Sequence, residues 1–348
     1  MSQDKIITIY DIAEKLKLSP STISRGLQNN TAVNAKTKKK IFDTANEMGY
    51  RFNTFARNLR TQNTNTIGVI VPRLNSYFIS AVLAGIEKVI NGAGYNMLIS
   101  QSLESSEKEV EYTKTMMHNR VDGLIVTLAA DTTNFDHFLP FVKHHIPLLF
   151  VDRVIDDENY SKVVIDNSKS GYDATTHLID QGCKRIVHIT GNTLRNVYRD
   201  RKLGYEKALI DHGIPVDHEL LFETDLTEVS ALKSVVKILK MNPLPDGLFV
   251  SNDFCAAICL KKLKQAGIKI PEDMAIVGFN NDTTSRITDP ALSTINYPGQ
   301  EMGEAVATNL INCLSNKDIS AKAQTIVLKS ELIVRESSFR REHKPIKL

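Results

Sequence analysis

Two series of short apolar runs separated by amphipathic stretches fill the chain from residue 67 onward, and they constrain its fold more than any other feature. Short apolar runs between helical stretches, such as 78–90 and 256–263, predict strands of parallel sheets covered by helices on both faces. Two successive series predict an α/β body with two lobes. The predicted buried strands are 67–71, 96–99, 123–126, 148–151 and 163–165, then 185–189, 247–250 and 275–279.

Polar residues lie at the ends of several of these predicted strands. They are Asp152-Arg153 after 148–151, Asn252-Asp253 after 247–250 and Ser251, and the segment 280–282 after 275–279. Open α/β sheets bind ligands beyond the carboxyl ends of their strands, so a cleft between the lobes is the expected binding site. Carboxylates, amides and guanidinium groups can hydrogen-bond sugar hydroxyls. Each of these residues could instead cap a helix or form a turn, and for Asp253 capping is an equally good explanation.

Positive charge concentrates in the N-terminal part of the chain. Residues 1–66 hold 11 Lys and Arg against 5 Asp and Glu, whereas the remainder holds 32 against 35. This asymmetry is the electrostatic footprint of a nucleic-acid-binding head on a nearly neutral body. A basic terminus that only improves solubility is the alternative explanation.

Three short helices are predicted within this basic segment. Thr8 with Asp11, Ser19 before a proline, and Asn34 are suitable helix N-caps. The second helix would present a polar outer face, and two short helices joined by a tight turn form a helix-turn-helix pattern. Lysines at 36, 38, 39 and 40 crowd the start of the third helix, where the helix dipole disfavours cations, so either DNA phosphates or solvent must neutralise them.

Four spaced motifs in this segment make the pattern specific: TIYDIA at 8–13, LSPSTISR at 18–25, VNAKT at 33–37 and GYRFN at 49–53. In order and spacing they resemble the lactose/galactose repressor family. The resemblance implies a three-helix helix-turn-helix DNA-binding head over residues 6–53 and a hinge helix and linker over 54–66. It also implies a two-lobed, periplasmic-binding-protein-like α/β body with parallel sheets over 67–340, which binds an effector and dimerises.

By this resemblance, the helix that begins at Ser19 enters the major groove, and positions 20, 21 and 25 face base edges. Because Pro20 has no side-chain donor or acceptor, direct reading rests on Ser21 and Arg25, and Arg can bind guanine through two hydrogen bonds. Gln28 stands where the family usually has Asn. In the hinge, Leu59 matches the leucine that wedges into the minor groove. The expected DNA-binding residues are Thr8, Tyr10, Ser19, Pro20, Ser21, Thr22, Ser24, Arg25, Gln28, Asn34, Lys36, Thr37, Arg57 and Leu59.

The same resemblance implies an effector site in the cleft. Leu226 stands where sugar-binding relatives often have an aromatic residue, and Asn280 stands where Asp is common. Since the chain has no Trp, stacking on a sugar ring would fall to an aromatic pair in the first lobe. The expected ligand-binding residues are Tyr77, Phe78, Asp152, Arg195, Arg201, Leu226, Asn252 and Asn280.

The sequence therefore predicts a ligand-responsive, sequence-specific transcription regulator of a catabolic operon, with repression as the family's usual output. Its expected partners are near-palindromic operator DNA, a small carbohydrate effector and a second copy of itself. Whether the ligand acts as inducer or corepressor stays open.

Other classes of protein are disfavoured by what the sequence lacks. It has no P-loop, G-x-S-x-G or H-E-x-x-H motif of an enzyme. Four scattered cysteines, including Cys255 and Cys259, are expected to be buried free thiols, and no metal or cofactor is expected. No secretory signal and no apolar run of about 18 residues is found, so a cytoplasmic location without a membrane segment is expected.

Overall fold

The computed structural model describes residues 7–50, 63–316 and 323–340, and it divides into two compact units at Asn63. The first unit contains the three predicted helices, α1 (Ile9–Leu16), α2 (Pro20–Leu27) and α3 (Ala35–Glu47). Each helix buries an isoleucine in a shared core, because Ile12, Ile23 and Ile41 have no exposed surface. The apolar residues at helical spacing thus form the core of a three-helix unit.

All three predicted helix starts are confirmed. The backbone amide and the hydroxyl of Thr8 both donate to Asp11 Oδ2, at 2.8 and 2.6 Å. The side chains of Ser19 and Asn34 accept from the amide three residues later, at 3.2 and 2.9 Å. These bonds satisfy amides that the first turn of a helix leaves without a partner, so the sequence signals act locally.

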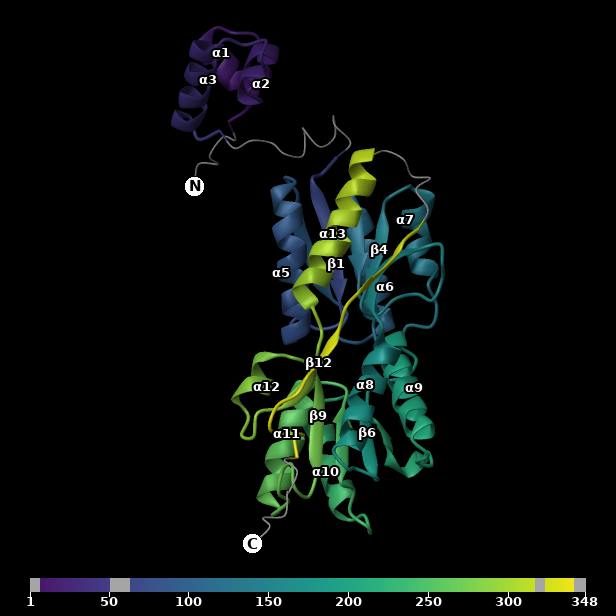
Figure 1. Cartoon of the computed structure of the whole chain (residues 1–348). Helices are drawn as coiled ribbons and strands as arrows, with labels where there is room; N and C mark the ends of the chain where they lie inside the picture. The colour runs from purple at the N-terminus through teal and green to yellow at the C-terminus, as the bar shows by residue number, and fades with distance from the viewer. Residues whose placement is uncertain (1–6, 51–62, 317–322, 341–348) are drawn as a thin grey trace, which may run out of the picture. The chain divides into compact units, whose positions relative to one another are not determined.

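The second unit, the body, has two lobes, and within the described residues each lobe is built on a six-stranded sheet (Figure 1). The first sheet has the order β11-β5-β4-β3-β1-β2 and the second β12-β10-β9-β8-β6-β7. Their pairings are parallel, apart from the antiparallel pairing of β10 with β12. The strands of the first sheet are β1 (Thr66–Val71), β2 (Asn96–Gln101), β3 (Gly123–Val126), β4 (Leu148–Val151), β5 (Ser161–Ile165) and β11 (Thr325–Leu328). Those of the second are β6 (Ile186–Thr190), β7 (Leu221–Glu223), β8 (Gly247–Val250), β9 (Ala275–Asn280), β10 (Ser293–Asn296) and β12 (Glu331–Ile333).

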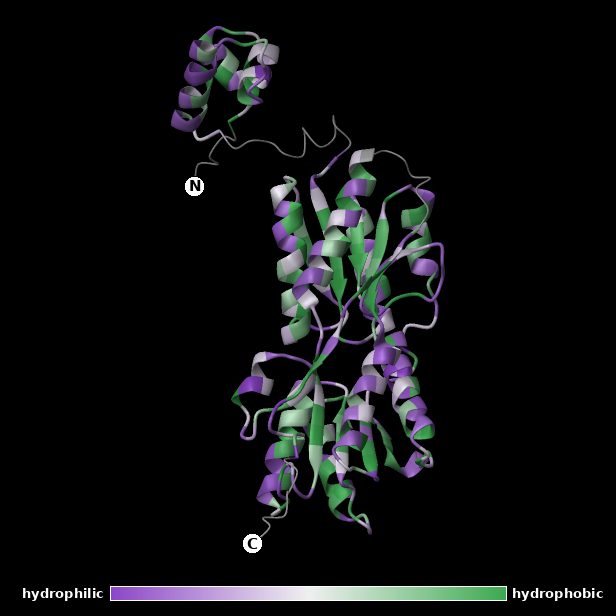
Figure 2. Cartoon of the chain, viewed as in Figure 1, coloured by the Kyte–Doolittle hydropathy of each residue, from purple (hydrophilic) through white to green (hydrophobic). Residues whose placement is uncertain are grey.

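Helices cover both faces of each sheet, which is the arrangement that the apolar runs predict. Figure 2 shows the strands as predominantly hydrophobic between helices with mixed faces. The first lobe contains α5 (Tyr77–Gly92), α6 (Ser106–His118), the 3-10 turn η1 (Asp136–Phe138), α7 (Leu139–Lys143) and α13 (Gly299–Asn316). The second contains α8 (Asn167–Asp180), α9 (Asn196–Asp211), η2 (His218–Leu220), α10 (Glu228–Leu239), α11 (Asp253–Gln265) and α12 (Thr283–Ile287).

The two lobes are not simply successive in the chain, and this differs from the prediction. Within the described residues the chain crosses between lobes at 165–167, 296–299 and 328–331, because α13 and β11 return to the first lobe and β12 returns to the second. Strands β7, β10, β11 and β12 were not predicted. They are three or four residues long, and several carry polar side chains.

One predicted strand has a different environment from the one expected. The segment 96–99 forms part of β2, but β2 ends its sheet and is partly exposed rather than buried, with Ile99 37% exposed. An edge strand has a neighbour on one side only, so its apolar run is not fully covered.

Two helix pairs make backbone contact at glycines. A Cβ atom on Gly204 of α9 would lie 2.0 Å from the Ser168 carbonyl oxygen of α8, and one on Gly171 of α8 would lie 2.3 Å from the Arg201 carbonyl oxygen of α9. Gly85 of α5 and Gly303 of α13 make the same kind of contact in the first lobe, at 2.1 Å each. No larger residue fits at these crossings unless the helices move apart.

Candidate DNA interface and ligand cavity

Most of the predicted DNA-contacting residues lie on the surface of the head, where solvent can reach them. Ser21, Arg25 and Gln28 are exposed on α2, and Tyr10 of α1 is 68% exposed. The hydroxyl of Ser19 lies 2.9 Å from that of Ser21 and 2.8 Å from that of Thr22. The outer face of α2 is therefore a row of hydrogen-bonding groups beside one guanidinium, and such groups can read base edges.

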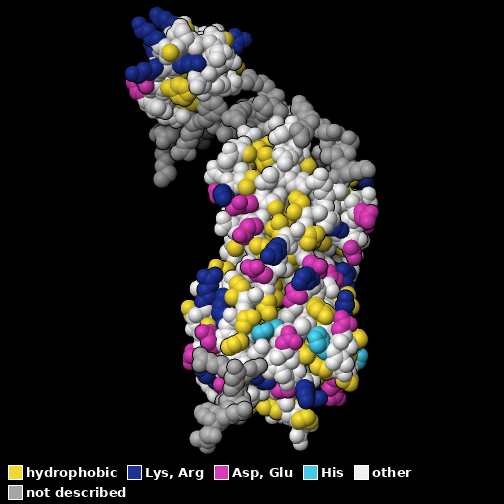
Figure 3. All heavy atoms as spheres, in the orientation of Figure 1, with side chains coloured by type: hydrophobic (Ala, Val, Ile, Leu, Met, Phe, Trp, Pro, Cys, Tyr) yellow, Lys and Arg dark blue, Asp and Glu magenta, His cyan; other side chains and the backbone are white. Residues whose placement is uncertain are grey.

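Lysines add positive charge beside this face. Lys36, Lys39 and Lys40 are exposed at the start of α3, and Lys38 donates to the Asn29 carbonyl oxygen at 3.0 Å. Figure 3 shows Lys and Arg side chains spread over the head. None of these four lysines forms an ion pair with an acidic side chain in the part of the chain that the structure describes. Phosphates are a fitting counter-charge.

Two of the predicted DNA-contacting residues lie in the hinge, outside the described ranges. Arg57 and Leu59 belong to the segment 51–62, which the structure does not describe. The other predicted DNA-contacting residues, from Thr8 to Thr37, lie in the described head, exposed or partly exposed.

A cavity of about 560 Å³ opens between the two lobes of the body, at the carboxyl ends of the strands. It is lined by side chains from both lobes, including seven of the eight predicted ligand-binding residues: Tyr77, Phe78, Asp152, Arg201, Leu226, Asn252 and Asn280. The structure thus brings together residues that are up to 203 positions apart, from Tyr77 to Asn280.

Arg195, the eighth predicted residue, lies outside this lining. It precedes α9, is 5% exposed, and its Nη2 donates to the carbonyl oxygen of Thr132 in the first lobe. Its guanidinium is therefore used in a contact between the lobes rather than turned toward the cavity.

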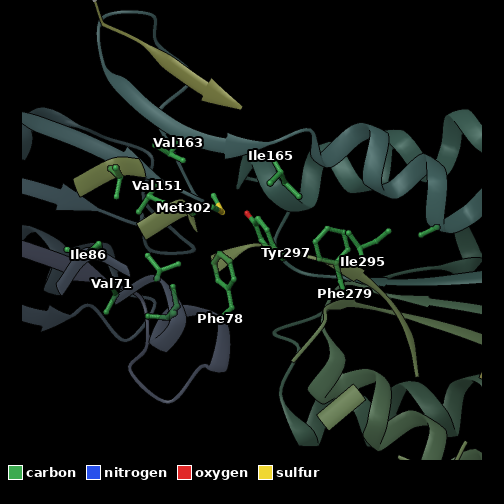
Figure 4. Close-up of a cluster of buried hydrophobic side chains, with 14 of the residues drawn as sticks. Val71, Phe78, Ile86, Val151, Val163, Ile165, Phe279, Ile295, Tyr297 and Met302 are labelled. Atoms are coloured by element: carbon green, nitrogen blue, oxygen red, sulfur yellow. The ribbon is translucent and has the colours of Figure 1, made fainter. Parts of the chain in front are cut away.

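An aromatic stack forms one wall of the cavity. The rings of Phe78 and Tyr297 stack with centroids 4.2 Å apart, and Phe279 meets Tyr297 edge-on at 5.6 Å. Figure 4 shows these three rings in series, from the first lobe to the second. Arg201 completes the series, because its Cζ lies 3.5 Å from the centre of the Phe279 ring. Cation–π contact of this kind holds a guanidinium over an aromatic face.

Arg201 is fixed by hydrogen bonds as well as by this stack. Its Nε donates to Asn167 Oδ1 at 2.9 Å and its Nη1 to the Ser251 carbonyl oxygen at 3.0 Å. Burial lowers the pKa of Arg201, although Tyr297 and other neighbours oppose the effect. The side chain is 3% exposed, so the protein's own groups hold it in place.

Asp152 is the buried carboxylate of the site. The hydroxyl of Tyr297 donates to its Oδ1, and burial raises the pKa of Asp152, against the opposing influence of Arg153 and of that hydrogen bond. Burial also raises the pKa of Tyr297, and the Asp152 charge adds to the rise. A carboxylate with a raised pKa beside an aromatic stack is typical of a functional site.

The charge of Arg153 is paired within the cavity. Its Nη1 lies 2.6 Å from Glu104 Oε2 and its Nη2 donates to the Tyr198 hydroxyl at 3.1 Å. Burial alone would lower the pKa of Arg153, but Tyr198, Glu104 and Asp152 together raise it. The guanidinium is therefore charged and already engaged.

Backbone strain gathers around the cavity. Glu104, Asp152, Leu226 and Asn280 all line it and have φ values of 64°, 66°, 56° and 114°. A left-handed conformation in a residue other than glycine costs roughly 1–3 kcal/mol and is often found at functional sites.

Two polar residues after β8 have different roles. Asn252 caps α11, because its Oδ1 accepts from the Cys255 amide at 2.7 Å, and it also lines the cavity. Asp253 has no exposed surface and accepts from the Thr294 hydroxyl at 2.7 Å and the Asp282 amide at 2.9 Å. Asp253 was expected either to cap a helix or to contact the ligand. It does neither, because Asn252 caps α11 and Asp253 does not line the cavity.

Sequence reasoning missed several lining residues, chiefly Tyr297 and Phe254. Tyr297 directly follows β10, so the rule about strand ends would have found it if 293–296 had been predicted as a strand. Phe254 lies in the first turn of α11, lines the cavity and is 50% exposed.

Other sequence expectations concern chemistry away from the cavity. Cys183, Cys255 and Cys259 are buried free thiols and Cys313 is partly buried. Among the described residues, no group of His, Cys, Asp and Glu is placed to hold a metal ion. The described helices include none with the length and apolar character needed to cross a membrane.

A helix-turn-helix head and a two-lobed body with a ligand cavity define a DNA-binding transcription regulator whose body resembles a periplasmic binding protein. The profile described as "Bacterial regulatory proteins, lacI family" matches residues 8–53, and that of the "Periplasmic binding protein-like domain" matches 175–338. HTH-type transcriptional regulator RegA of Clostridium saccharobutylicum is 33% identical over 333 residues, covering 95% of this chain and 99% of RegA. The chain belongs to the LacI family of bacterial transcription regulators, which are not enzymes, and the resemblance inferred from the sequence is confirmed.

Solved structures share this fold. The lac repressor dimer bound to operator and the anti-inducer ONPF superposes with a TM-score of 0.85 at 22% identity, covering 97% of this chain and all of that chain. The periplasmic binding protein/LacI transcriptional regulator from Alkaliphilus metalliredigens QYMF, complexed with D-xylulofuranose, has a TM-score of 0.70 at 26% identity. It covers 79% of this chain, which in turn covers all of that chain. The predicted fold class is therefore correct.

Proposed function

We propose that this regulator controls a catabolic operon in response to an uncharged carbohydrate that binds in the interlobe cavity. We propose further that it acts as a homodimer on a near-palindromic operator. The observation that carries the proposal is the cavity wall in which the stacked rings of Phe78 and Tyr297 lie beside the Asp152 carboxylate. Behind this wall Phe279 meets Tyr297 edge-on and holds Arg201 over its face.

The chemistry of this wall suits a sugar. Apolar faces of sugar rings pack on aromatic side chains, while a few fixed polar groups bind the hydroxyls and set orientation. A volume of about 560 Å³ falls in the usual range for small-molecule sites. The bound D-xylulofuranose of the Alkaliphilus metalliredigens relative supports the same class of ligand.

The charges of the cavity favour an uncharged ligand. Each of the three lining arginines is already engaged: Arg153 and Arg73 with Glu104, at 2.6 and 3.6 Å, and Arg201 with its two hydrogen-bond acceptors. Carboxylates outnumber them in the described lining, which includes Glu104, Asp152, Asp225, Glu228 and Asp282. A sugar phosphate would therefore meet repulsion without a guanidinium free to clamp it.

A melting-temperature panel of neutral sugars and their phosphates tests this proposal. We expect at least one neutral sugar to raise the Tm of the wild-type protein, to change its operator affinity, and to remain unconsumed during incubation. If only phosphorylated or acidic ligands raise the Tm, the proposed ligand class is wrong.

Arg201→Ala should abolish the response to the ligand found in that panel. If the ligand is an inducer, the variant keeps its ligand-free operator affinity, and if the ligand is a corepressor, the variant stays weakly bound. Arg185→Ala is the matched control, because Arg185 is a partly buried arginine just before β6 that pairs with Asp217 at 3.3 Å and does not line the cavity. A response of Arg201→Ala at the wild-type ligand concentration would remove the cavity assignment.

The proposed homodimer is supported by the dimeric lac repressor structure and by apolar side chains left on the body surface. Ile287 and Ile210 are 77% and 64% exposed, and neither lines the cavity. One short reading helix contacts only a few base pairs, so two-fold pairing doubles the site. Sedimentation that shows only monomer, with and without operator DNA, would contradict the dimer.

A further inference from the structure

Three side chains just before and at the start of α9 reach from the second lobe to the backbone of the first. We call Asn192, Arg195 and Asn196 the α9 clamp. Asn196 makes the most complete contact, because its Oδ1 accepts from the Val154 amide at 3.0 Å while its Nδ2 donates to the Asp152 carbonyl oxygen at 3.1 Å. One side chain thus pairs with both a donor and an acceptor of the loop after β4.

The other two clamp residues hold the loop after β3. Asn192 Nδ2 donates to the Ala130 carbonyl oxygen at 3.3 Å, and Arg195 Nη2 donates to that of Thr132. In the first lobe, every partner of the clamp is a backbone atom. The contacts therefore depend on where the lobes lie relative to each other, and not on the identity of the side chains in these loops.

The first lobe presents these carbonyl groups on a rigid loop. Glu109 of α6 has no exposed surface, and it accepts from the Ala129 amide at 2.7 Å and the Thr132 hydroxyl at 3.0 Å. His137 Nε2 lies 3.0 Å from the same carboxylate. A buried carboxylate with three partners fixes the loop that receives Arg195, since moving the loop would break all of them.

The clamp is separate from the ligand cavity. The lining includes the next residues of α9, Val197 and Tyr198, but not Asn192, Arg195 or Asn196. Arg195 is also held at a cost, because its Nε is buried without a hydrogen-bond partner among the described residues. Burial and the nearby Arg153 charge lower the pKa of Arg195, and the carboxylates of Glu109 and Asp131 oppose this effect. Separation of the lobes would return this guanidinium to water, so the contact can be made and broken.

We propose that the α9 clamp holds the two lobes in the closed arrangement, the one that the effector also favours, so that it sets effector affinity without touching the effector. The inference rests on the proposed effector function of the cavity. The apparent Kd equals the intrinsic Kd divided by the fraction of protein in the competent arrangement, so a weakened clamp lowers affinity for every ligand by one common factor.

Amide hydrogen exchange at Val154 in the ligand-free, full-length protein tests the clamp directly. The Val154 amide donates to Asn196, so Arg195→Gln and Asn192→Ala leave that bond itself intact. If the clamp residues act together through the position of the lobes, Val154 exchanges about fivefold faster or more in each variant. Asn91→Ala is the matched control, since Asn91 Nδ2 donates only within α5, to Glu87 at 2.7 Å. Unchanged exchange at Val154 in both clamp variants would overturn the proposal.

Ligand and operator titrations supply the second readout. We expect Arg195→Gln to weaken every ligand that binds the wild type by the same factor, with their rank order unchanged. We also expect its ligand-free operator affinity to move in the direction opposite to the shift that ligand causes. Losses that differ from ligand to ligand would mean that Arg195 contacts the ligand, and would overturn the proposal. If no carbohydrate binds the wild type, the proposed function fails, while the exchange measurement still decides the clamp.

Discussion

Replacement of Glu109 by alanine should strongly destabilise the body. The substitution removes the only carboxylate that accepts from the Ala129 amide, the Thr132 hydroxyl and the His137 ring in the described structure. Ala129 and Thr132 have no exposed surface, so water cannot replace the lost acceptor there. A buried donor without a partner costs about 1–3 kcal/mol, and three of them, after some relaxation, total about 3–5 kcal/mol.

Glu109→Gln separates the acceptor from the charge. The amide keeps one oxygen and the same volume, while the Thr132 hydroxyl and the His137 ring can each turn to accept from the new NH2 group. We therefore expect a loss of only about 1 kcal/mol. Glu111→Ala is the control, because Glu111 is exposed on the same helix, and surface changes of this kind stay within about 0.5 kcal/mol.

Urea denaturation followed by circular dichroism, together with the Tm of the body, measures these differences. For Glu109→Ala we expect the Tm to fall by roughly 5–15 °C, and for Glu109→Gln by a few degrees at most. If the alanine variant proved as stable as the wild type, the reasoning from unsatisfied donors would be refuted. If the glutamine variant lost as much as the alanine variant, the charge of Glu109 would matter more than its three hydrogen bonds.

Three further predictions concern the head, the cavity and the helix pairs. Arg25→Ala should weaken operator binding by about 1–3 kcal/mol and relax preference at one base pair, and a set of singly substituted operators would show whether preference changes. Burial raises the pKa of Asp152, so its contribution to the free energy of unfolding falls as pH rises from its unfolded pKa, about 3.9, through its folded pKa. Asp152→Asn should therefore be more stable than the wild type at pH 7, with a difference that disappears near pH 4, and yet bind ligand poorly; a less stable variant at pH 7 would contradict this. Gly204→Ala should cost about 1–3 kcal/mol or more and reduce ligand affinity, because its Cβ would displace the backbone of α8, whereas Gly92→Ala, with open space around it, should not.

Local signals in the sequence predicted local structure well. The caps Thr8, Ser19 and Asn34 act within one turn of their own helices, so their effect does not depend on the rest of the fold. The apolar runs were equally informative for central strands, which are covered on both faces. The strand 293–296 was not predicted, because its polar side chains interrupt the apolar run that marks a buried strand. These side chains are buried with partners far away in the chain, as Thr294 is with Asp253, and such partners are not visible in the local sequence.

The candidate site was predictable where a strand end was predictable. Asp152, Asn252 and Asn280 each follow a strand that the sequence marks clearly, and they meet at one cavity. Tyr297 and Arg195 show the limit of this reasoning. The role of Tyr297 depends on a short strand, and that of Arg195 on how closely the lobes approach, which no spacing along the chain determines.

The glycine contacts between helices bear on how such proteins can be recombined. Helix α8 starts where the chain first crosses between lobes, and α13 starts where it crosses back, and each is locked to a neighbour, α9 or α5, backbone against backbone. The first of these helix pairs lies wholly between the crossings at 165–167 and 296–299, whereas α5 and α13 lie on either side of that segment. A hybrid of two relatives can therefore exchange the whole segment between these two crossings, which keeps α8 with α9 and α5 with α13. A single junction would separate α5 from α13 or α8 from α9, and would pair surfaces that had never been fitted to each other.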